Sequence, residues 1–165
     1  MCAETAEGNI SAEVRPGRVQ DLPAIQAILQ DTPEAAAWNP KSLEEVFELN
    51  VKYFFIAEKD GAVLGFIAGR RLLDEAEVLN LAVLPAARKK GLGRALLQVL
   101  VEAFSGEGTL QVFLEVRESN RSAISFYRHA GFAQIGKRPG YYRNPEEAAL
   151  VLAVGRNADM TGSTG

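Results

Sequence analysis

Apolar positions along the chain follow two spacings, which alternate from one segment to the next. A recurrence every three to four residues predicts a helix, and β-branched or aromatic runs bounded by glycine or proline predict strands. The segments with helical spacing are residues 19–30, 39–50, 91–106 and 121–132. The strand-type segments are residues 10–16, 53–59, 62–73, 76–85, 110–119, 133–139 and 147–154. This alternation predicts one α/β or α+β domain built on a mixed sheet.

Turn and cap residues agree with these boundaries. Asp60-Gly61 separates two strand-type runs and predicts the tight turn of a hairpin. Asp21 is placed to cap the first helix. Asn120 or Ser122 is placed to cap the fourth helix, and Gly131 is placed to end it.

Composition and charge limit the partners. The 165 residues carry a net charge of −3, so the molecule as a whole does not attract nucleic acid. A single cysteine and a single histidine give no metal-binding spacing and no disulfide framework, which favours a reducing cytoplasm. No apolar run reaches the roughly 18 residues of a membrane span, and the start has no signal-peptide pattern. Both ends lack periodicity, so we expect flexible tails over residues 1–9 and 155–165 around a domain over 10–154.

The stretch RKKGLGRALL, residues 88–97, lies between a predicted strand and a predicted helix. The start of a helix attracts anions, and glycines let a phosphate approach the backbone closely. The stretch is not a Walker loop, because its lysines precede the glycines and no Ser or Thr follows. It is not a dinucleotide fingerprint, because Leu96 stands where a third glycine is required. An anion site and a helix start with a solvated basic face both remain open.

Three longer segments carry a family resemblance. DEAEVLNLAVLPAARKKGLGRALL contains the pattern Arg/Gln-x-x-Gly-x-Gly/Ala after a strand and before a helix. Together with FLEVRESNRSAISFYRHAGF and RPGYYRNPEEAALVLAV, it resembles the GNAT N-acetyltransferases over residues 10–154. The resemblance implies the GNAT fold, with a mixed, mostly antiparallel sheet of six or seven strands and about four helices. It also implies acetyl-CoA as the cosubstrate and no metal.

The resemblance assigns the cofactor to this loop and to the strand before it. Backbone groups of the loop would bind the pyrophosphate, basic side chains would form a local clamp, and the strand would pair with the pantetheine arm. The residues so implied are Leu81, Ala82, Val83, Arg88, Lys89, Lys90, Gly91, Leu92, Gly93 and Arg94. Asn120 would hydrogen-bond the cofactor arm, cap its own helix, or do both.

The resemblance assigns proton transfer to Glu115 and Tyr127. Glu115 lies in the middle of a predicted strand and matches the general base of the family. A salt bridge with Arg117 or Arg121 is the alternative. Tyr127 matches the acid that protonates the leaving thiolate, since a tyrosine with a reference pKa of about 10 keeps its proton until a basic thiolate forms. The alternative for Tyr127 is an ordinary core aromatic residue. His129 lies on another face of the same helix, so we do not expect it to act as the base.

Within the family the chain resembles the RimI-like ribosomal-protein alanine acetyltransferases, which acetylate the α-amino group of a protein N-terminus. Trp38 and the pair Tyr141 and Tyr142 would shape the acceptor site, and Glu77 would attract a cationic acceptor. A packing anchor and a solvated charge are the alternatives for Trp38 and Glu77. Ala148 stands where the family has Asp, which leaves the acceptor open.

Two other functions stay open at this point. The chain could acetylate a small amine, such as an amino acid, a polyamine or an antibiotic. It could also be a non-catalytic acyl-CoA-binding module, although the presence of both Glu115 and Tyr127 argues against this. The expected partners are therefore a protein N-terminus, for example that of a small-subunit ribosomal protein, or a small amine. We expect no nucleic acid, no membrane, and a monomer or weak dimer.

Overall fold

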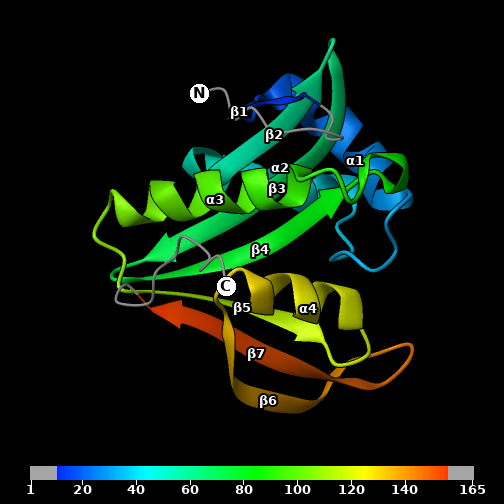
Figure 1. Cartoon of the computed structure of the whole chain (residues 1–165). Coiled ribbons are helices and arrows are strands. Elements are labelled where there is room, and N and C mark those ends of the chain that lie inside the picture. Colours follow the sequence, from blue (N-terminus) through cyan, green and yellow to red (C-terminus); the bar gives the residue numbers. More distant parts are fainter. Residues whose placement is uncertain (1–10, 156–165) are drawn as a thin grey trace. The chain divides into compact units, whose positions relative to one another are not determined.

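The computed structural model describes residues 11–155 (Figure 1). They form two compact units: residues 11–70 with 78–103, and residues 71–77 with 104–155. The strands follow the hydrogen-bonded order β1-β2-β3-β4-β5-β7-β6. Seven strands and four α-helices in this part of the chain confirm the predicted fold class. A single domain over 10–154 stays a prediction, and the predicted tails lie outside the described residues except for Gly155, which ends a strand.

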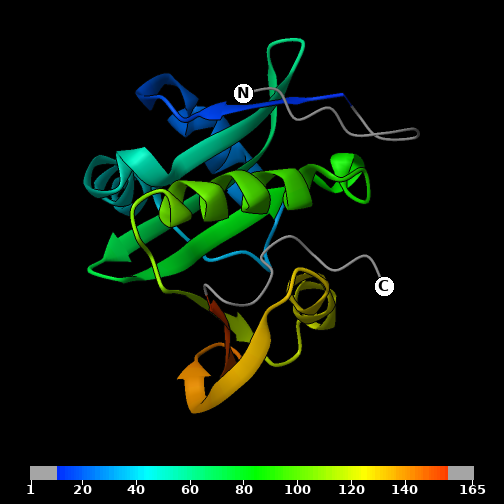
Figure 2. The same ribbon diagram turned by 60° about the vertical axis from the view of Figure 1, so that its left-hand side comes forward.

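The first unit holds the N-terminal strands and three helices. Its strands are β1 (Glu13–Pro16), β2 (Phe54–Lys59), most of β3 (Ala62–Leu72) and the second part of β4 (Glu75–Val83). Its α-helices are α1 (Leu22–Gln30), α2 (Pro40–Leu49) and nearly all of α3 (Leu92–Ser105). Its short 3₁₀ helices are η1 (Val19–Asp21), η2 (Val51–Tyr53) and η3 (Pro85–Ala87). In Figures 1 and 2, α3 crosses one side of strands β2–β4, and α1 and α2 cover the other side.

The core of this unit follows from the two spacings in the sequence. Apolar residues of α1 and α2 meet those of alternate positions on β2 and β3. The buried members are Ile25, Ile28, Leu43, Phe47, Phe54, Ile56, Phe66, Ala68 and Ala82. The hairpin turn is confirmed, since Asp60 and Gly61 adopt φ angles of 50° and 81°, as a two-residue turn with positive φ requires.

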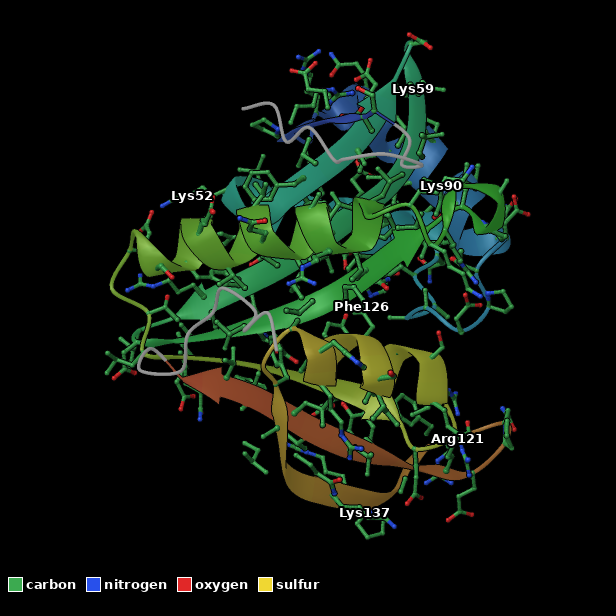
Figure 3. All side chains as sticks on the ribbon, in the orientation of Figure 1. Lys52, Lys59, Lys90, Arg121, Phe126 and Lys137 are labelled. Atoms are coloured by element: carbon green, nitrogen blue, oxygen red, sulfur yellow. The ribbon has the colours of Figure 1, made fainter. Side chains whose placement is uncertain are left out.

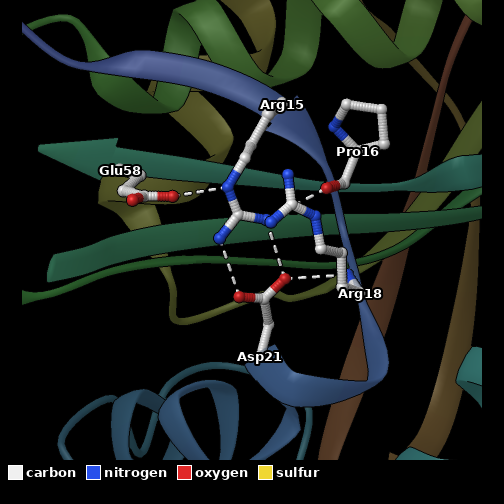
Figure 4. Close-up of polar contacts among 5 residues, drawn as sticks. All are labelled: Arg15, Pro16, Arg18, Asp21 and Glu58. Carbon is white, nitrogen blue, oxygen red and sulfur yellow. Dashed lines mark hydrogen bonds and ion pairs between the residues drawn. The ribbon is translucent and has the colours of Figure 1, made fainter. Parts of the chain in front are cut away.

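One cap prediction is wrong in its detail. Asp21 stands at the N-cap position of α1, but its side chain makes no cap hydrogen bond there. It accepts two hydrogen bonds from the Arg15 guanidinium, both at 2.8 Å, and one from the Arg18 backbone N–H at 2.7 Å (Figure 4). Arg15 also pairs with Glu58 on β2. The carboxylate is therefore committed to a charged partner on β1, and that contact joins η1 to the sheet.

The second unit holds the C-terminal strands and one helix. Its elements are the start of β4, β5 (Gln111–Arg117), α4 (Arg121–His129), β6 (Ala133–Tyr142) and β7 (Glu147–Gly155). Strand β7 pairs antiparallel with both β5 and β6. The parallel ladder between β4 and β5 covers Glu75–Glu77 and Gln111–Phe113. Alternate residues of β5 are buried, which confirms that Glu115 lies on the face opposite Leu114 and Val116.

Candidate functional site

The loop between β4 and α3 has the backbone of an anion site. Lys89 and Gly91 adopt positive φ angles of 60° and 84°, and α3 begins at the next residue, Leu92. Successive N–H groups in such a turn point to one side, and the first N–H groups of a helix have no partner within it. This donor set suits an anion, and binding of the acetyl-CoA pyrophosphate by the loop stays a prediction.

The basic side chains of the loop differ in their contacts. Lys89, Lys90 and Arg94 make no ion pair with any other residue between 11 and 155. Figure 3 shows Lys90 beside the start of α3. Arg88 instead donates from Nε to the carbonyl oxygen of Val83 at 3.0 Å and pairs with Glu34. Three of the four predicted basic residues therefore keep their charge available to an anion.

The predicted cofactor strand is the end of β4. Ala82 points into the core of the first unit and is 5% exposed, whereas Leu81 and Val83 are half-buried on the other face. The ladder to β5 covers only the positions up to Glu77, so the backbone of Leu81 to Val83 takes no part in it. A backbone edge of this kind can pair with an extended ligand.

Asn80 is a polar residue that sequence reasoning missed. It is 5% exposed, and its side chain accepts from the Ala36 N–H at 3.2 Å and donates to the Ala36 carbonyl at 3.0 Å. Both hydrogen-bonding groups of the amide are thus satisfied by one residue of the connection between α1 and α2. A lone Asn among apolar strand residues was the available signal, because buried polar groups require partners.

Trp38, in the same connection, is partly buried. Its ring lies 6.4 Å from that of Phe54 and 6.3 Å from that of Phe66, and its backbone carbonyl accepts from Gln26. These contacts agree with the packing-anchor alternative. They leave part of the ring accessible, so a role toward the acceptor stays a prediction.

Glu115 has partners that the sequence did not indicate. Its side chain is 13% exposed and forms an ion pair with Arg138 of β6, with 3.1 Å between Oε1 and Nε. The salt bridge expected as an alternative, with Arg117 or Arg121, is absent among the described contacts. A hydrogen bond with Glu115 raises the pKa of Tyr141, as does partial burial. Glu115 is therefore held between a guanidinium and a phenol.

Tyr127 on α4 is 8% exposed and packs against Phe132 and Phe126, with ring centroids 5.5 Å and 5.0 Å away. Burial raises the pKa of its hydroxyl. Within residues 11–155 no hydrogen bond reaches that hydroxyl. It is a proton donor that no neighbour in the described chain uses, while its ring belongs to the core.

Asn120 confirms one of its two predicted roles. Its side-chain oxygen accepts from the Ala123 N–H at 3.1 Å, which caps α4. The oxygen is committed, whereas the side-chain NH₂ group remains for a further acceptor. Contact with the cofactor stays a prediction.

Tyr141 and Tyr142 end β6, with ring centroids 5.0 Å apart. The Arg117 guanidinium lies 4.2 Å from the Tyr142 ring, and burial raises the pKa of Tyr142 to about 12. Arg117 also reaches Glu147 of β7 at 3.7 Å. Both tyrosines and Glu77 lie in the second unit with Glu115, and the charge of Glu77 contributes to the raised pKa of Tyr141.

In the described part of the chain, no group of three or more His, Cys, Asp or Glu side chains could hold a metal ion. The helices described here are all too short or too polar to cross a bilayer.

Comparison with known proteins identifies the family of the chain. Residues 22–132 match the acetyltransferase (GNAT) family. The chain belongs to this family. It is therefore an acetyl-CoA-dependent N-acetyltransferase, and this outcome disfavours a non-catalytic acyl-CoA-binding module.

Individual relatives show which members of the family the chain resembles. The chain is 34% identical over 137 residues to the [ribosomal protein bS18]-alanine N-acetyltransferase of Escherichia coli K12, spanning 81% of this chain and 90% of that one. The crystal structure of the E. coli ribosomal-protein-S18-alanine N-acetyltransferase has a TM-score of 0.77 and 31% identity, covering 93% of this chain and 96% of that one. Ard1 from Thermoplasma volcanium has a TM-score of 0.83 and 26% identity, covering 88% and 97%. These matches confirm the predicted resemblance to the RimI-like enzymes.

Proposed function

We propose that this enzyme transfers the acetyl group of acetyl-CoA to the N-terminal α-amine of a protein, of the ribosomal-protein type. The observation that carries the proposal is the 34% identity to an enzyme of that activity over 90% of its length. Recognition of a shared acceptor requires a shared site, and the match to the family spans residues 22–132, which include β5 and α4. The acceptor is the part of this proposal that an experiment must decide.

The cofactor would be held by the first unit. The backbone of Lys89 to Arg94 offers the N–H groups of a turn and of a helix start to the pyrophosphate. Lys89, Lys90 and Arg94 add positive charge to a protein whose net charge is −3. Leu81 to Val83 would align the pantetheine arm along the strand, and a backbone N–H there would polarise the thioester carbonyl. The Asn120 NH₂ group would add a contact to the arm.

The protons would be moved by two side chains of the second unit. Glu115 would accept the proton of the attacking ammonium, which needs modest assistance because an α-amine titrates near pH 8. Tyr127 would return a proton to the departing thiolate as the carbon–sulfur bond breaks. Burial raises the pKa of Tyr127, so its hydroxyl stays protonated at neutral pH. The result is a direct transfer in a ternary complex, with one acid and one base.

The acceptor site would be formed by Tyr141, Tyr142, Glu77 and Trp38. Tyr141 is 49% exposed and bound to Glu115, so an acceptor amine near the base would also lie near this ring. Glu77 and Glu115 together place negative charge around that ring, which suits a cationic ammonium.

A panel of acceptors tests the proposal. Thiol release from acetyl-CoA is followed with peptides that carry different N-termini, one of them that of the small-subunit ribosomal protein, and with small amines beside them. We expect the highest kcat/KM with a peptide. Turnover of a small amine without release for any peptide would overturn the proposed acceptor and favour the small-molecule function.

Substitution of the base gives a second test. Glu115→Gln removes the proton acceptor and keeps the shape, so kcat should fall by about 10²-fold or more. Glu118→Gln is a matched control, since it neutralises an exposed acid of the next turn, paired with Lys137, that has no proposed role. Equal kcat for Glu115→Gln and the wild type would assign the base to another group or to water.

A further inference from the structure

Arg88 is the one basic residue of the loop whose charge is already committed. Its Nε donates to the carbonyl of Val83, the last residue of β4, and Nη2 pairs with the Glu34 carboxylate. The guanidinium thus links the last residue of β4 to Glu34, and the two paired side chains are 42% and 43% exposed. Lys89 and Lys90 follow directly in the chain and make no such contacts within the described residues.

The partner of Arg88 sits on a fixed support. Glu34 belongs to the connection between α1 and α2, residues 31–39. Two residues further on, Ala36 is held by both hydrogen bonds of the buried Asn80 amide. Trp38 then packs its ring against Phe54 and Phe66. Because the connection is anchored at Ala36 and Trp38, Glu34 can hold the Arg88 side chain in place.

We propose that Arg88 is a positioning residue, which braces the anion loop against Glu34 and does not clamp the phosphate with its own charge. The proposal rests on the proposed role of the loop in binding the cofactor. It assigns the phosphate-facing charge to Lys89, Lys90 and Arg94, and it gives the connection between α1 and α2 a part in cofactor affinity.

The direction in which one substitution changes the affinity for CoA tells whether Arg88 braces the loop or clamps the phosphate. Glu34 is a carboxylate close to a site for a polyanion. If Arg88 were a clamp, Glu34→Gln would free the guanidinium and remove a repulsive charge, so CoA would bind more tightly. If Arg88 is a brace, Glu34→Gln removes its support, the loop loses order, and CoA binds more weakly. The two hypotheses therefore predict opposite changes.

Equilibrium binding of CoA measures this change without turnover. Trp38 is the only tryptophan, so its fluorescence can report binding, with calorimetry beside it. We expect Glu34→Gln and Arg88→Gln each to raise the Kd about two- to fivefold, the range that an exposed ion pair supports. The double variant should resemble Arg88→Gln, because that single variant already removes the ion pair that Glu34→Gln breaks. Glu107→Gln is the control, since it breaks a comparable ion pair with Arg71 outside the loop and changes the net charge equally.

Hydrogen exchange of the ligand-free protein gives a second, independent readout. In both variants the amides of residues 84–91 should exchange faster than in the wild type, whereas Glu107→Gln leaves them unchanged. The proposed positioning role of Arg88 would be overturned by any of three results. These are tighter CoA binding by Glu34→Gln, additive effects in the double variant, and unaltered hydrogen exchange. A wild type that fails to bind CoA would overturn the proposed cofactor role of the loop, and the exchange data would still decide whether the brace exists.

Discussion

The Asp21 carboxylate offers a stability prediction that can be worked out in detail. The side chain is 8% exposed and accepts three hydrogen bonds, two from Arg15 and one from the Arg18 N–H (Figure 4). Asp21→Ala removes every one of them and leaves the guanidinium with Glu58 as its remaining carboxylate. Asp21→Asn keeps one oxygen, which can still accept from the Arg18 N–H.

The loss of unfolding free energy depends on how deeply the ion pair is buried and on which hydrogen bonds survive the substitution. Loss of one partner of a buried ion pair costs about 3–5 kcal/mol of unfolding free energy. Arg15 is 15% exposed and keeps Glu58, so we place Asp21→Ala at the lower end, at about 3 kcal/mol. For Asp21→Asn we expect about 1.5 kcal/mol, because one backbone hydrogen bond survives.

Urea unfolding at several pH values is the assay. The midpoint should fall while the slope m stays constant, which marks a change in stability alone. The hydrogen bonds from Arg15 lower the pKa of Asp21 below its ordinary value, so the carboxylate stabilises the fold above the unfolded pKa of about 4. This stabilisation is lost as the pH falls through the folded pKa. The difference between the wild type and Asp21→Asn should therefore be full at pH 7 and shrink below pH 4.

Two results would refute this reasoning. A loss under about 0.5 kcal/mol for Asp21→Ala at pH 7 would mean that the network is no stronger than a surface pair. A difference between the wild type and Asp21→Asn that does not shrink in acid would show that the charge of Asp21 is not its source. Glu118→Gln should change stability by about 0.5 kcal/mol or less, because its pair with Lys137 is 48% exposed on both sides.

The remaining predictions concern Tyr127, the proposed acid, and two glycines. Tyr127→Phe should lower kcat by about 10²-fold or more with an unchanged Kd for CoA, and an unaltered kcat in steady-state assays would exclude it as the acid. Gly65→Ala should cost about 2 kcal/mol in urea unfolding, because its Cβ would lie 2.9 Å from the Ala82 carbonyl oxygen. Gly91→Ala strains a φ of 84° and should raise the Kd for CoA about fivefold in a binding titration. A Kd equal to that of the wild type would mean that the loop tolerates a side chain there.

The element order could be predicted because local patterns determine it. Helical spacing, the Asp60-Gly61 turn and the Asn120 cap each depend on residues a few positions apart, and the structure confirms all three. The sheet order and the two-unit division could not be predicted in this way. Pairs such as β5 with β7 join distant segments whose apolar patterns fit several neighbours equally well.

The ion-pair partners of charged side chains were the feature that the sequence predicted least well. Glu115 pairs with Arg138, which lies 23 positions away on a strand that is not its neighbour in the sheet. Arg138 reaches it across β7, in which Ala149 pairs with Arg138 and Val151 pairs with Glu115. Sequence reasoning offered only Arg117 and Arg121, which are near in the chain, as alternative partners of Glu115. Proximity along a strand or helix says little about the charge that a long side chain finds across a sheet.

The proposed assignment of cofactor binding to the first unit and of proton transfer to the second has a kinetic consequence. The anion loop and the end of β4 belong to the first unit, whereas Glu115, Tyr127 and the tyrosine pair belong to the second. Substitutions in the loop, such as Gly91→Ala, should therefore act on the affinity for CoA and leave the acid–base step intact. Substitutions of the acid or base should act on kcat at unchanged affinity. A loop variant whose loss falls on kcat alone would show that the loop takes part in the chemistry and does more than hold the cofactor.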